Sequence, residues 1–566
     1  MKHFFANVLG FVGGLLVWLG ATAAHVHAQA PAWQSAVAFR PDPNTPVSGN
    51  LSVMATATDT AGNVYLCGTF NGTAVFGTIS LASARNYGFD VFVAKWNPRT
   101  GSFAWAQRAG GGGTVSVTSL AVQGTAVYIG GSFFQSATFG ATTLTCASNR
   151  NDVYVAKLTD VGAGTAFTWA VRTETTGSLF EVRDAYLTAS GSGLYLATNF
   201  VGAATVGGST LVSAGYNDVL VAKLTDAGPT ARFTWAQRAG GPAIDFAYAV
   251  AVAGDKVYIA GTTSGTADFG ATALSSANGV SGFVAKLTDA GPTGSFTWAR
   301  LAGQYAYALA TSGPSVYLAG TFVGSATLGT LPVSSSGNSV ASFVAKLADA
   351  GPTASFTWAQ VAGGPTNCFL NHLAARGPNV YATGAFYQAV QVGSTALTSY
   401  GRYDGLLVKL VDAGPSGSIA WAQQAGGPGD DGLGDILLGN GSVSASGGMT
   451  DDVRFGSVVL AAAGGSTNGF LASVADAALL ATAAPMQPGT LRVFPNPAHG
   501  TATVQLPPGT VAADLVVRDA AGRALRGRVR PAAHGTAEVD LAGLAPGLYG
   551  LFTTASPRFS SRLLVN

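Results

Sequence analysis

The chain has 566 residues and a formal net charge of +2, and only 10% of its residues are charged, against about 25% in an average soluble protein. So balanced a charge argues against binding of nucleic acid through phosphate contacts, and the presence of only three glutamates excludes a coiled coil or a helical solenoid. Glycine contributes 77 residues and hydrophobic residues 48%, which fits an all-β protein with a buried core and many tight turns.

Residues 1–28 have the pattern of a secretory signal peptide. Lys2 precedes an apolar run from Phe4 to Gly20, and small and polar residues follow. A membrane anchor is the alternative, but the run is short for a span, which needs about 20 residues. Cleavage is expected after Ala28, because Pro31 would hinder cleavage after Ala30. No later apolar run reaches the length of a span, so we expect no transmembrane segment in the mature chain.

Four landmarks recur seven times between residues 31 and 476. They are a tryptophan, a strand of the type Val-Tyr-Ile-Ala-Gly, a Phe-Gly pair and a strand of the type Phe-Val-Ala-Lys-Leu. The tryptophans assigned to the repeat are Trp33, Trp105, Trp169, Trp235, Trp298, Trp358 and Trp421.

One repeat predicts four short strands, at residues 247–252, 257–261, 283–287 and 296–300, separated by turns rich in glycine and proline. Four antiparallel strands, repeated seven times, predict a seven-bladed β-propeller of four-stranded blades over residues 29–478. The repeats resemble those of bacterial secreted β-propeller proteins, on segments such as 152–160 and 281–300. This resemblance is specific for fold and says little about function.

The phase of the repeat predicts how the ring closes. The chain begins with the Trp33 strand, which has no first strand before it, and the repeats end with the strand Phe470–Val474, which has no tryptophan strand after it. The N-terminal strand is therefore expected to close the propeller as the outer strand of the seventh blade, which removes an open sheet edge.

Residues 479–490 break the repeat and are interpreted as a linker, and residues 491–566 as a small Ig-like β-sandwich. This last segment carries eight arginines and no lysine, which sets it apart in composition. Its expected strands are 491–494, 501–506, 513–518, 537–540, 548–553 and 561–565.

The C-terminal segment resembles the type A C-terminal sorting domain of type IX secretion in Bacteroidetes. The matching motifs are Val493–Ala498, Asp519–Arg523, Leu544–Tyr549 and Arg562–Val565. The resemblance implies handling by the type IX secretion machinery, export through the periplasm to the outer cell surface or the medium, and removal of the domain. An ordinary Ig-like binding module is the alternative. The residues assigned to the sorting signal are Pro495, Asn496, Pro497, Gly547, Tyr549 and Arg562.

The propeller repeats contain no complete catalytic constellation, so no enzyme activity, cofactor or metal is expected. His372 is the only histidine in the repeats, which excludes a multi-histidine zinc site there. Cys368 and His372 lie four residues apart in one predicted loop and form a nominal thiol–imidazole pair, for which a structural role is favoured.

Aspartates recur at two fixed phases of the repeat and are interpreted as turn formers that bind nearby backbone N–H groups. The first set is Asp90, Asp152, Asp218 and Asp404, and the second is Asp160, Asp226, Asp289, Asp349 and Asp412. Two groups of unrepeated acids fit catalysis, calcium binding or mere solvated loop charge. These are Glu174, Glu181 and Asp184 in one loop, and Asp430, Asp431 and Asp435 in another.

Two classes of loops vary most between repeats and should open on one face, where function tends to reside. Their Tyr, Asn and Arg side chains suit planar polar ligands such as glycans, although Asn also serves simply to make turns. The leading hypothesis is an extracellular binding or scaffold module with a glycan or surface-protein partner; a polysaccharide-acting enzyme and a purely structural surface-layer protein are the alternatives. The candidate binding residues are Asn86, Tyr87, Arg150, Tyr216, Asn217, Tyr305, Phe369, Tyr400, Arg402 and Tyr403.

Overall fold

The computed structural model describes residues 30–41, 49–84, 88–146, 151–175, 184–462, 466–480, 489–506, 511–519, 523–525, 528–532, 536–553 and 559–565. Apart from two short 3-10 turns, η1 (Ala477–Leu479) and η2 (Ala512–Asp514), its regular structure is all β, which confirms the predicted class. None of the helices in these ranges is long and apolar enough to cross a membrane. The chain divides into two compact units, Met1–Leu479 and Leu480–Asn566, here called the main body and the C-terminal unit. The predicted signal peptide and its cleavage site at Ala28 lie outside the described residues.

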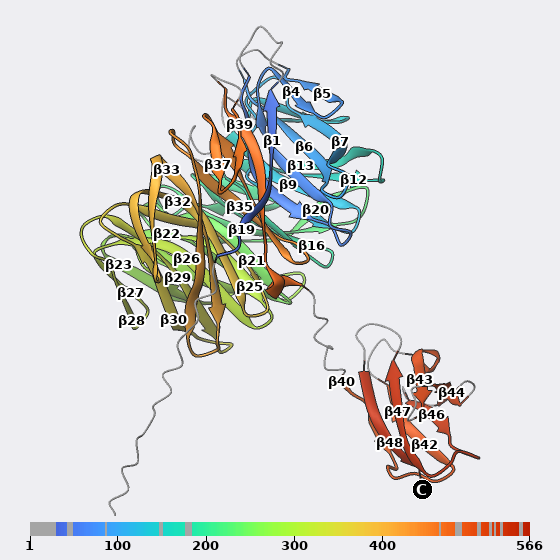
Figure 1. Ribbon diagram of the computed structural model, residues 1–566. Helices are drawn as coiled ribbons and strands as arrows, with labels where there is room; N and C mark the ends of the chain where they lie inside the picture. The colour runs from blue at the N-terminus through green and yellow to red at the C-terminus, as the bar shows by residue number, and fades with distance from the viewer. Residues whose placement is uncertain are drawn as a thin grey trace, which may run out of the picture. The chain divides into compact units, whose positions relative to one another are not determined.

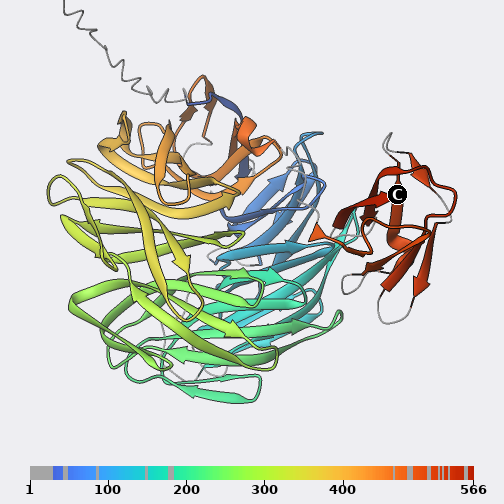
Figure 2. The ribbon, with the colours of Figure 1, turned by 90° about the horizontal axis from the view of Figure 1, so that it is seen from below.

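The main body consists of four-stranded antiparallel units that follow one another along the chain, named A to G here (Figures 1 and 2). Unit A contains β2 (Leu51–Thr58), β3 (Val64–Phe70), β6 (Asp90–Asn97) and β7 (Ser102–Ala109). Unit B contains β8 (Ser119–Gln123), β9 (Ala126–Phe134), β12 (Asn151–Asp160) and β13 (Thr165–Arg172). Unit C contains β15 (Tyr186–Ser190), β16 (Gly193–Phe200), β19 (Asp218–Asp226) and β20 (Ala231–Ala239).

Unit D contains β21 (Phe246–Ala253), β22 (Lys256–Phe269), β23 (Thr272–Asp289) and β24 (Gly294–Leu301). Unit E contains β25 (Tyr305–Ser312), β26 (Ser315–Val323), β29 (Val340–Asp349) and β30 (Ala354–Gly363). Unit F contains β31 (Cys368–Arg376), β32 (Asn379–Val392), β33 (Thr395–Asp412) and β34 (Gly417–Ala425). Unit G contains β35 (Gly432–Leu438), β36 (Ser442–Met449), β39 (Asn468–Ala475) and, from the other end of the sequence, β1 (Trp33–Pro41).

The second and third strands continue into an outer hairpin that the sequence analysis read only as a Phe-Gly landmark. In unit D, β22 and β23 pair as far as Phe269 and Thr272, and Gly270 turns the chain with a φ of 61°, which favours glycine. In unit F, β32 and β33 are likewise continuous, and in the remaining five units the hairpin is a separate strand pair. These pairs are β4 (Thr73–Phe76) with β5 (Ile79–Ala82), β10 (Ser136–Phe139) with β11 (Thr142–Thr145), β17 (Ala203–Val206) with β18 (Ser209–Val212), β27 (Ser325–Leu328) with β28 (Leu331–Ser334), and β37 (Val453–Phe455) with β38 (Val458–Leu460).

Each outer hairpin pairs with the end of the preceding unit, so backbone hydrogen bonds join the units in series. The paired residues from unit A to unit G are Gly110↔Thr138, Glu174↔Thr205 through β14 (Glu174–Thr175), Gly240↔Asp268, Ala302↔Leu328, Ala362↔Val392 and Gly426↔Arg454. β1 makes the corresponding contact from unit G to unit A, with Arg40 opposite Val75 of β4.

β1 pairs antiparallel with β39, which is the neighbour that the phase of the repeat predicted, but its register differs from the prediction. Trp33 lies opposite Val474, and Ser35 lies opposite Ser473. In unit F the residue equivalent to Ser473 is Lys409, and it pairs with Trp421. Ser35 therefore occupies the tryptophan position, and the assignment of Trp33 to it was wrong by two residues.

Trp33 instead fills the place of the phenylalanine that lies two residues before the tryptophan in units A to E, where unit F has Ile419. The Trp33 and Phe455 rings lie edge to face with their centres 5.2 Å apart. In unit D, Phe296 and Phe269 are arranged in the same way, with ring centres 5.6 Å apart. The Trp33 indole N–H donates to the Gln424 carbonyl oxygen of unit F (3.1 Å). Matching by residue type could not reveal this shift, because register is decided by packing of the whole strand.

The second set of repeated aspartates lies in buried clusters that join consecutive units. Asp349 of unit E accepts hydrogen bonds from the Tyr258 hydroxyl (2.7 Å) and the Trp298 indole (3.2 Å) of unit D, and its carboxylate lies 2.9 Å from the Lys286 ammonium of that unit. Gly351 N–H donates to the same carboxylate (3.0 Å), which is the turn-forming role that the sequence predicted. A matching lysine and tyrosine surround Asp160, Asp226, Asp289, Asp412 and Asp476.

The first set of aspartates combines turn formation with ion pairing inside a unit. Ala84 N–H donates to Asp90 (2.7 Å), and Arg108 of the adjacent strand lies 2.6 Å from the same carboxylate. Arg172 and Arg238 pair with Asp152 and Asp218 in the same way. At Asp404 the arginine is replaced by Gln424, which donates to the carboxylate at 2.7 Å.

The boundary between unit G and unit A, here called the seam, lacks the Lys–Tyr–Asp–Trp cluster. Serines replace its side chains: Ser473 takes the lysine position, Ser444 the tyrosine position and Ser35 the tryptophan position. The hydroxyls of Ser35 and Ser473 form a hydrogen bond of 2.7 Å. A cavity of about 880 Å³ lies at this boundary, and Asn97 and Pro98 of unit A are among its lining residues. The seam is therefore held by apolar packing, as of Leu437 and Leu471 against Leu51 and Leu66, and not by a buried ion pair.

The C-terminal unit contains two sheets that share one core. The first holds β40 (Gly489–Thr490), β48 (Phe559–Val565), β47 (Gly547–Thr553), β43 (Leu515–Arg518) and β44 (Ala524–Leu525). The second holds β41 (Arg492–Phe494), β42 (Thr501–Gln505), β46 (Thr536–Asp540) and β45 (Val529–Ala532). Both sheets contribute to a single buried cluster that includes Val504, Val539, Val517 and Leu551.

Two details of the predicted C-terminal strands were wrong. The strand expected from residue 513 begins at Leu515, because Ala512–Asp514 form η2. β44 and β45 were not predicted, since β45 reads Val-Arg-Pro-Ala, without the alternation of apolar and polar residues that marks a half-buried strand.

Candidate functional site

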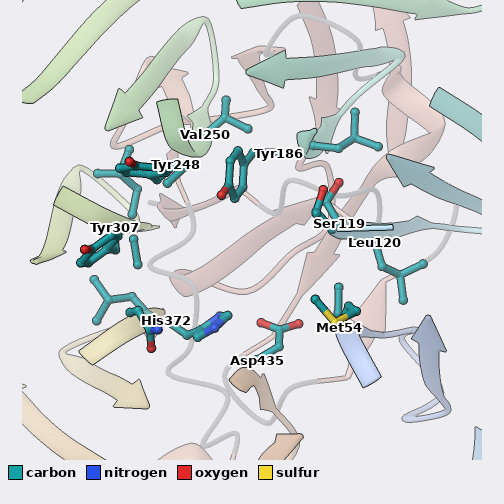
Figure 3. Close-up of a pocket in the computed structure, with 17 residues that line it drawn as sticks. Met54, Ser119, Leu120, Tyr186, Tyr248, Val250, Tyr307, His372 and Asp435 are labelled. Carbon is teal, nitrogen blue, oxygen red and sulfur yellow. The ribbon is translucent and has the colours of Figure 1, made fainter. Parts of the chain in front are cut away.

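The first strands of the units surround a cavity of about 340 Å³, called the inner cavity (Figure 3). It is lined from β2, β8, β15, β21, β25, β31 and β35, so every unit contributes to it. Most first strands supply small residues there, such as Ala55, Ala249 and Ala308. The larger side chains that break this pattern give the cavity its chemistry.

Recurrent β-bulges direct several of these side chains into the inner cavity. The register shifts by one residue between Val53 and Ala55, between Ala247 and Ala249, between Ala306 and Ala308, and between Leu370 and His372. A bulge inserts an unpaired residue and re-aims its side chain. The inserted residues are Met54, Tyr248, Tyr307 and Asn371, and all of them line the cavity.

Aromatic rings form a continuous run along units D and E. Tyr248 and Tyr307 have their ring centres 5.4 Å apart, and Tyr305 stacks on Tyr307 at 5.6 Å with an interplanar angle of 5°. Phe246 extends the run, 6.1 Å from Tyr248. Tyr186 lies across the cavity from Asp435 in Figure 3.

The tyrosine hydroxyls of the cavity are neutral at physiological pH. Burial raises the pKa of Tyr248 and Tyr307 above the ordinary value of 10, and burial with a neighbouring Asp184 carboxylate raises the pKa of Tyr186 well above it. Each hydroxyl therefore stays protonated and can donate or accept a hydrogen bond.

His372 and Asp435 lie side by side at the edge of the inner cavity (Figure 3). Burial lowers the pKa of the His372 imidazole, and the attraction of Asp435 offsets only part of that effect, so the ring is neutral at pH 7. Asp435 accepts hydrogen bonds from the Thr56 N–H (2.7 Å), the Thr56 hydroxyl (2.9 Å) and the N–H of the next residue, Ile436 (2.9 Å). Asp435 is the one formally charged residue among the described residues that line the cavity.

The nominal pair of Cys368 and His372 does not form a catalytic dyad. Both residues lie on β31 and not in a loop, with the bulge between them. Cys368 is fully buried in the core between units, where burial raises the pKa of its thiol to about 12, whereas His372 lines the cavity. The favoured structural interpretation of Cys368 is consistent with this placement, because a reactive thiolate needs a lowered pKa.

The predicted binding residues are spread over different environments. Asn86, Tyr87 and Arg150 lie outside the described residues. Tyr216 and Tyr400 are 67% and 59% exposed, respectively, whereas Asn217 is fully buried and presents no surface to a ligand.

The remaining predicted residues fall into two groups. Tyr305 joins the aromatic run beside the inner cavity. Phe369 lies 6.4 Å from Tyr403, and the exposed Arg402 forms an ion pair of 3.1 Å with Asp430. The structure thus brings Phe369, Arg402 and Tyr403 together around units F and G, apart from the run that contains Tyr305.

The unrepeated acids separate likewise. Asp430 is exposed, Asp431 is buried and Asp435 lines the inner cavity. Burial and the neighbouring carboxylates of Asp404, Asp451 and Asp430 raise the pKa of Asp431 to about 7. In the other group, Glu174 is exposed, 3.4 Å from Arg172, Asp184 accepts a hydrogen bond from Tyr186 (3.4 Å), and Glu181 lies outside the described residues. Among the described residues, no three His, Cys, Asp or Glu side chains are placed to hold a metal ion.

The residues assigned to the sorting signal meet at the last strand of the C-terminal unit. The Asn496 side-chain oxygen accepts a hydrogen bond from Leu564 N–H (2.9 Å), between Pro495 and Pro497, which both follow cis peptide bonds. Arg562 lies opposite Gly550 in the ladder between β48 and β47, which begins at Gly547. The Tyr549 hydroxyl donates to the Ala545 carbonyl oxygen (2.9 Å).

Residues 492–565 match the family model described as the secretion system C-terminal sorting domain. The chain therefore carries a sorting domain of type IX secretion and is exported to the cell surface or into the medium. This finding confirms the predicted localisation and the handling by type IX secretion machinery.

No curated protein sequence matches this chain. Among solved structures, a Trypanosoma rangeli sialidase in complex with sialic acid aligns at 12% identity and a TM-score of 0.32, covering 80% of this chain and 60% of the sialidase. A phage phi92 endosialidase aligns at 12% identity and a TM-score of 0.33, covering 94% of this chain and 87% of the endosialidase. A Pyrococcus horikoshii acylaminoacyl peptidase aligns at 8% identity and a TM-score of 0.34, covering 81% of this chain and 58% of the peptidase. Likeness at this level carries no inference about activity.

Sequence reasoning missed the cavity residues Tyr186, Tyr248 and Tyr307. These tyrosines lie in the first strands of their units, whereas the candidate binding residues predicted from the sequence were assigned to loops. A usable signal was present: Tyr248 and Tyr307 follow Ala247 and Ala306 at the same phase of the repeat, and most other units have no aromatic residue there. A departure from the repeat at this phase therefore predicts a residue that lines the cavity.

Proposed function

We propose that the main body is a seven-bladed β-propeller closed by its N-terminal strand. Two features support this proposal: consecutive units are joined by hairpin contacts, and β1 pairs both with β39 of unit G and with β4 of unit A. In Figure 2 the colours of consecutive units progress from blue through green and yellow to orange around the body. The inner cavity is then the channel at the centre of the ring.

The propeller acts, in our proposal, as an extracellular binding module that takes a planar polar ligand in the inner cavity. The observation that carries this proposal is the concentration of Tyr186, Tyr248, Tyr307, His372 and Asp435 around one cavity in an otherwise repetitive scaffold. Half-buried tyrosine rings offer apolar faces for stacking, and neutral hydroxyl and imidazole groups offer hydrogen bonds. A sugar ring has complementary features, so a glycan is the favoured ligand and a surface protein the alternative partner.

A polysaccharide-acting enzyme is the second candidate, favoured by the unrepeated Asp435 and His372. Glycoside hydrolysis ordinarily requires two carboxyl groups flanking the bond. Asp435 is the single carboxylate among the described residues that line the cavity, so binding without hydrolysis is the stronger proposal. A purely structural surface-layer protein would have the same channel, but it would not need Tyr248, His372 and Asp435 to line it.

The C-terminal unit serves as a type A export address in a Bacteroidetes host and is removed from the mature protein. The match of residues 492–565 to the sorting-domain family supports this proposal.

A glycan array probed with the full chain from residue 29 onward tests the binding proposal. We expect a restricted set of glycans to bind and binding to fall at least tenfold in Tyr307→Ala, which removes the central ring of the aromatic run. Tyr400→Ala is the comparison variant, because Tyr400 is an exposed tyrosine outside the cavity and one of the loop residues predicted from the sequence to bind the ligand, so it separates a loop site from a cavity site. Equal loss in both variants, or release of reducing ends from bound glycans, would reject a binding module centred on the inner cavity.

A further inference from the structure

We infer that the inner cavity selects a ligand that carries a protonated amine, and specifically a glycan residue with a free amino group. This inference rests on the proposed binding function and adds the chemistry of its ligand. Its basis is a carboxylate with no cationic partner among the described lining residues, in a cavity that tyrosine rings border on the other side, in a protein that elsewhere binds an ammonium group between a tyrosine and a carboxylate.

The charge of the cavity is negative and has no internal counterion. Asp435 is its single formally charged residue among those described, and His372 is neutral because it is buried. The hydrogen bonds that Asp435 accepts come from neutral groups, the Thr56 N–H and hydroxyl and the Ile436 N–H. The attraction between a cation in this space and the Asp435 carboxylate would be stronger than in bulk water, because the local dielectric constant is lower.

The other structural acids of the main body show what such a carboxylate normally receives. Asp160 is 2.6 Å from the Lys95 ammonium, which also lies over the Tyr65 ring at 5.3 Å. The same arrangement of lysine, tyrosine and aspartate recurs at Lys157 over Tyr128, Lys223 over Tyr195 and Lys409 over Tyr381. The chain therefore repeatedly binds an ammonium group between a tyrosine face and a carboxylate.

The inner cavity also contains tyrosine rings and a carboxylate, with no lysine among its described lining residues, but Tyr186 lies across the space from Asp435 and donates its hydroxyl to Asp184. Figure 3 shows Asp435 facing the space that Tyr186, Tyr248 and Tyr307 border. Aromatic faces attract cations through the ring quadrupole, and the attraction increases when both are removed from water. The missing ammonium is therefore expected to come from the ligand.

A sugar is favoured over a simple amine because the cavity also contains hydrogen-bonding groups that an amine alone would leave unused. Ser119, Asn371 and His372 line it together with the hydroxyls of the tyrosines. A volume of about 340 Å³ admits one end of a glycan chain and not a folded segment of protein. Uronic and sialic acids are disfavoured, because the described lining offers no lysine or arginine to a carboxylate.

Isothermal titration calorimetry of the full chain from residue 29 onward tests the inference with three probes. These are a tetramer of β-1,4-linked glucosamine, its fully N-acetylated counterpart, and choline, which carries a cation without a sugar. We expect the free-amine tetramer to bind at least tenfold more tightly than the acetylated one, and choline to bind more weakly than the free-amine tetramer. Asp435→Asn should abolish the preference for the free amine, with little change for the acetylated tetramer.

Two controls separate the charge of Asp435 from its structural contacts. Thr56→Val removes the hydroxyl bond to Asp435 and keeps the carboxylate, so the preference for the amine should persist. Asp268→Asn removes an exposed acid outside the cavity and should change nothing. The thermal midpoint of each variant verifies that it is folded.

The outcomes distinguish the two levels of the proposal. Equal or tighter binding of the acetylated tetramer, or a preference that survives in Asp435→Asn, overturns the inference and leaves the binding function standing. Choline binding as tightly as the free-amine tetramer overturns the assignment to a glycan. Failure of all three probes to bind overturns the inference, and the glycan array then decides the proposed function separately.

Discussion

The buried clusters between units should dominate the stability of the main body, and Asp349 offers the sharpest test. Its side chain is 1% exposed and that of Lys286 is 4% exposed, so both charges are largely removed from water. Asp349→Asn preserves the shape and leaves the Lys286 ammonium buried without a counterion. Breaking a buried pair from one side costs about 3–5 kcal/mol, against about 0.5 kcal/mol or less for a surface substitution. We therefore expect a loss of about 4 kcal/mol.

Urea unfolding followed by tryptophan fluorescence measures this loss. Past residue 30, every tryptophan lies between Trp33 and Trp421, so the signal reports the main body and not the C-terminal unit. Asp268→Asn is the matched control, an exposed acid on β22 of the neighbouring unit. In the double variant Lys286→Met and Asp349→Asn, part of the stability should return, because the unpaired charge is gone.

The pH dependence of the same variant has a defined sign. Burial alone would raise the pKa of Asp349, but hydrogen bonds from Lys286, Tyr258, Gly351 and Trp298 lower it overall below 3.8. A lowered pKa contributes stability that is complete above the unfolded value and lost as the pH falls through the folded value. The difference between wild type and Asp349→Asn should therefore be full at pH 7 and shrink below pH 3.8. A loss under 1 kcal/mol at pH 7, or one equal to that of the control, would refute the reasoning.

Three further predictions concern a buried acid, the seam and the sorting domain. Asp431→Asn should stabilise the protein at pH 8 and have little effect at pH 4. The pKa of Asp431 is raised to about 7, so its ionisation lowers the stability of the folded state by at most about 4 kcal/mol as the pH rises from 4 through 7. Thermal midpoints across this pH range check the prediction, and an effect independent of pH would contradict it. Deleting residues 29–38 should expose the edge of β39 and cause unfolding or aggregation, seen by light scattering, whereas an unchanged monomer would show that β1 is dispensable. A chain that ends at residue 478 should accumulate in the periplasm of a host with type IX secretion, and mass spectrometry of the exported full chain should find it shortened by about 80 residues; an intact Asn566 outside the cell would argue against a removable address.

Local chemistry was enough to predict the all-β class, the repeated strands and the C-terminal sorting domain. Strands such as β16 and β26 are marked by β-branched and aromatic residues between glycine turns, and those signals act over a few residues. The sorting motifs are likewise contiguous, so each could be recognised from neighbouring residues. The turn-forming role of the repeated aspartates was also visible, because Gly351 lies two residues after Asp349.

Contacts between distant segments were decided only by the tertiary structure. The bridging role of Asp349 depends on Lys286, which lies 63 residues earlier, and nothing in the local sequence links them. The register of β1 depends on packing of Trp33 against Phe455, and the inner cavity depends on bulges that turn Tyr248 and Tyr307 out of the ladder. A one-residue shift reverses the face of a strand, so the residues that reach the cavity follow from register and not from residue type.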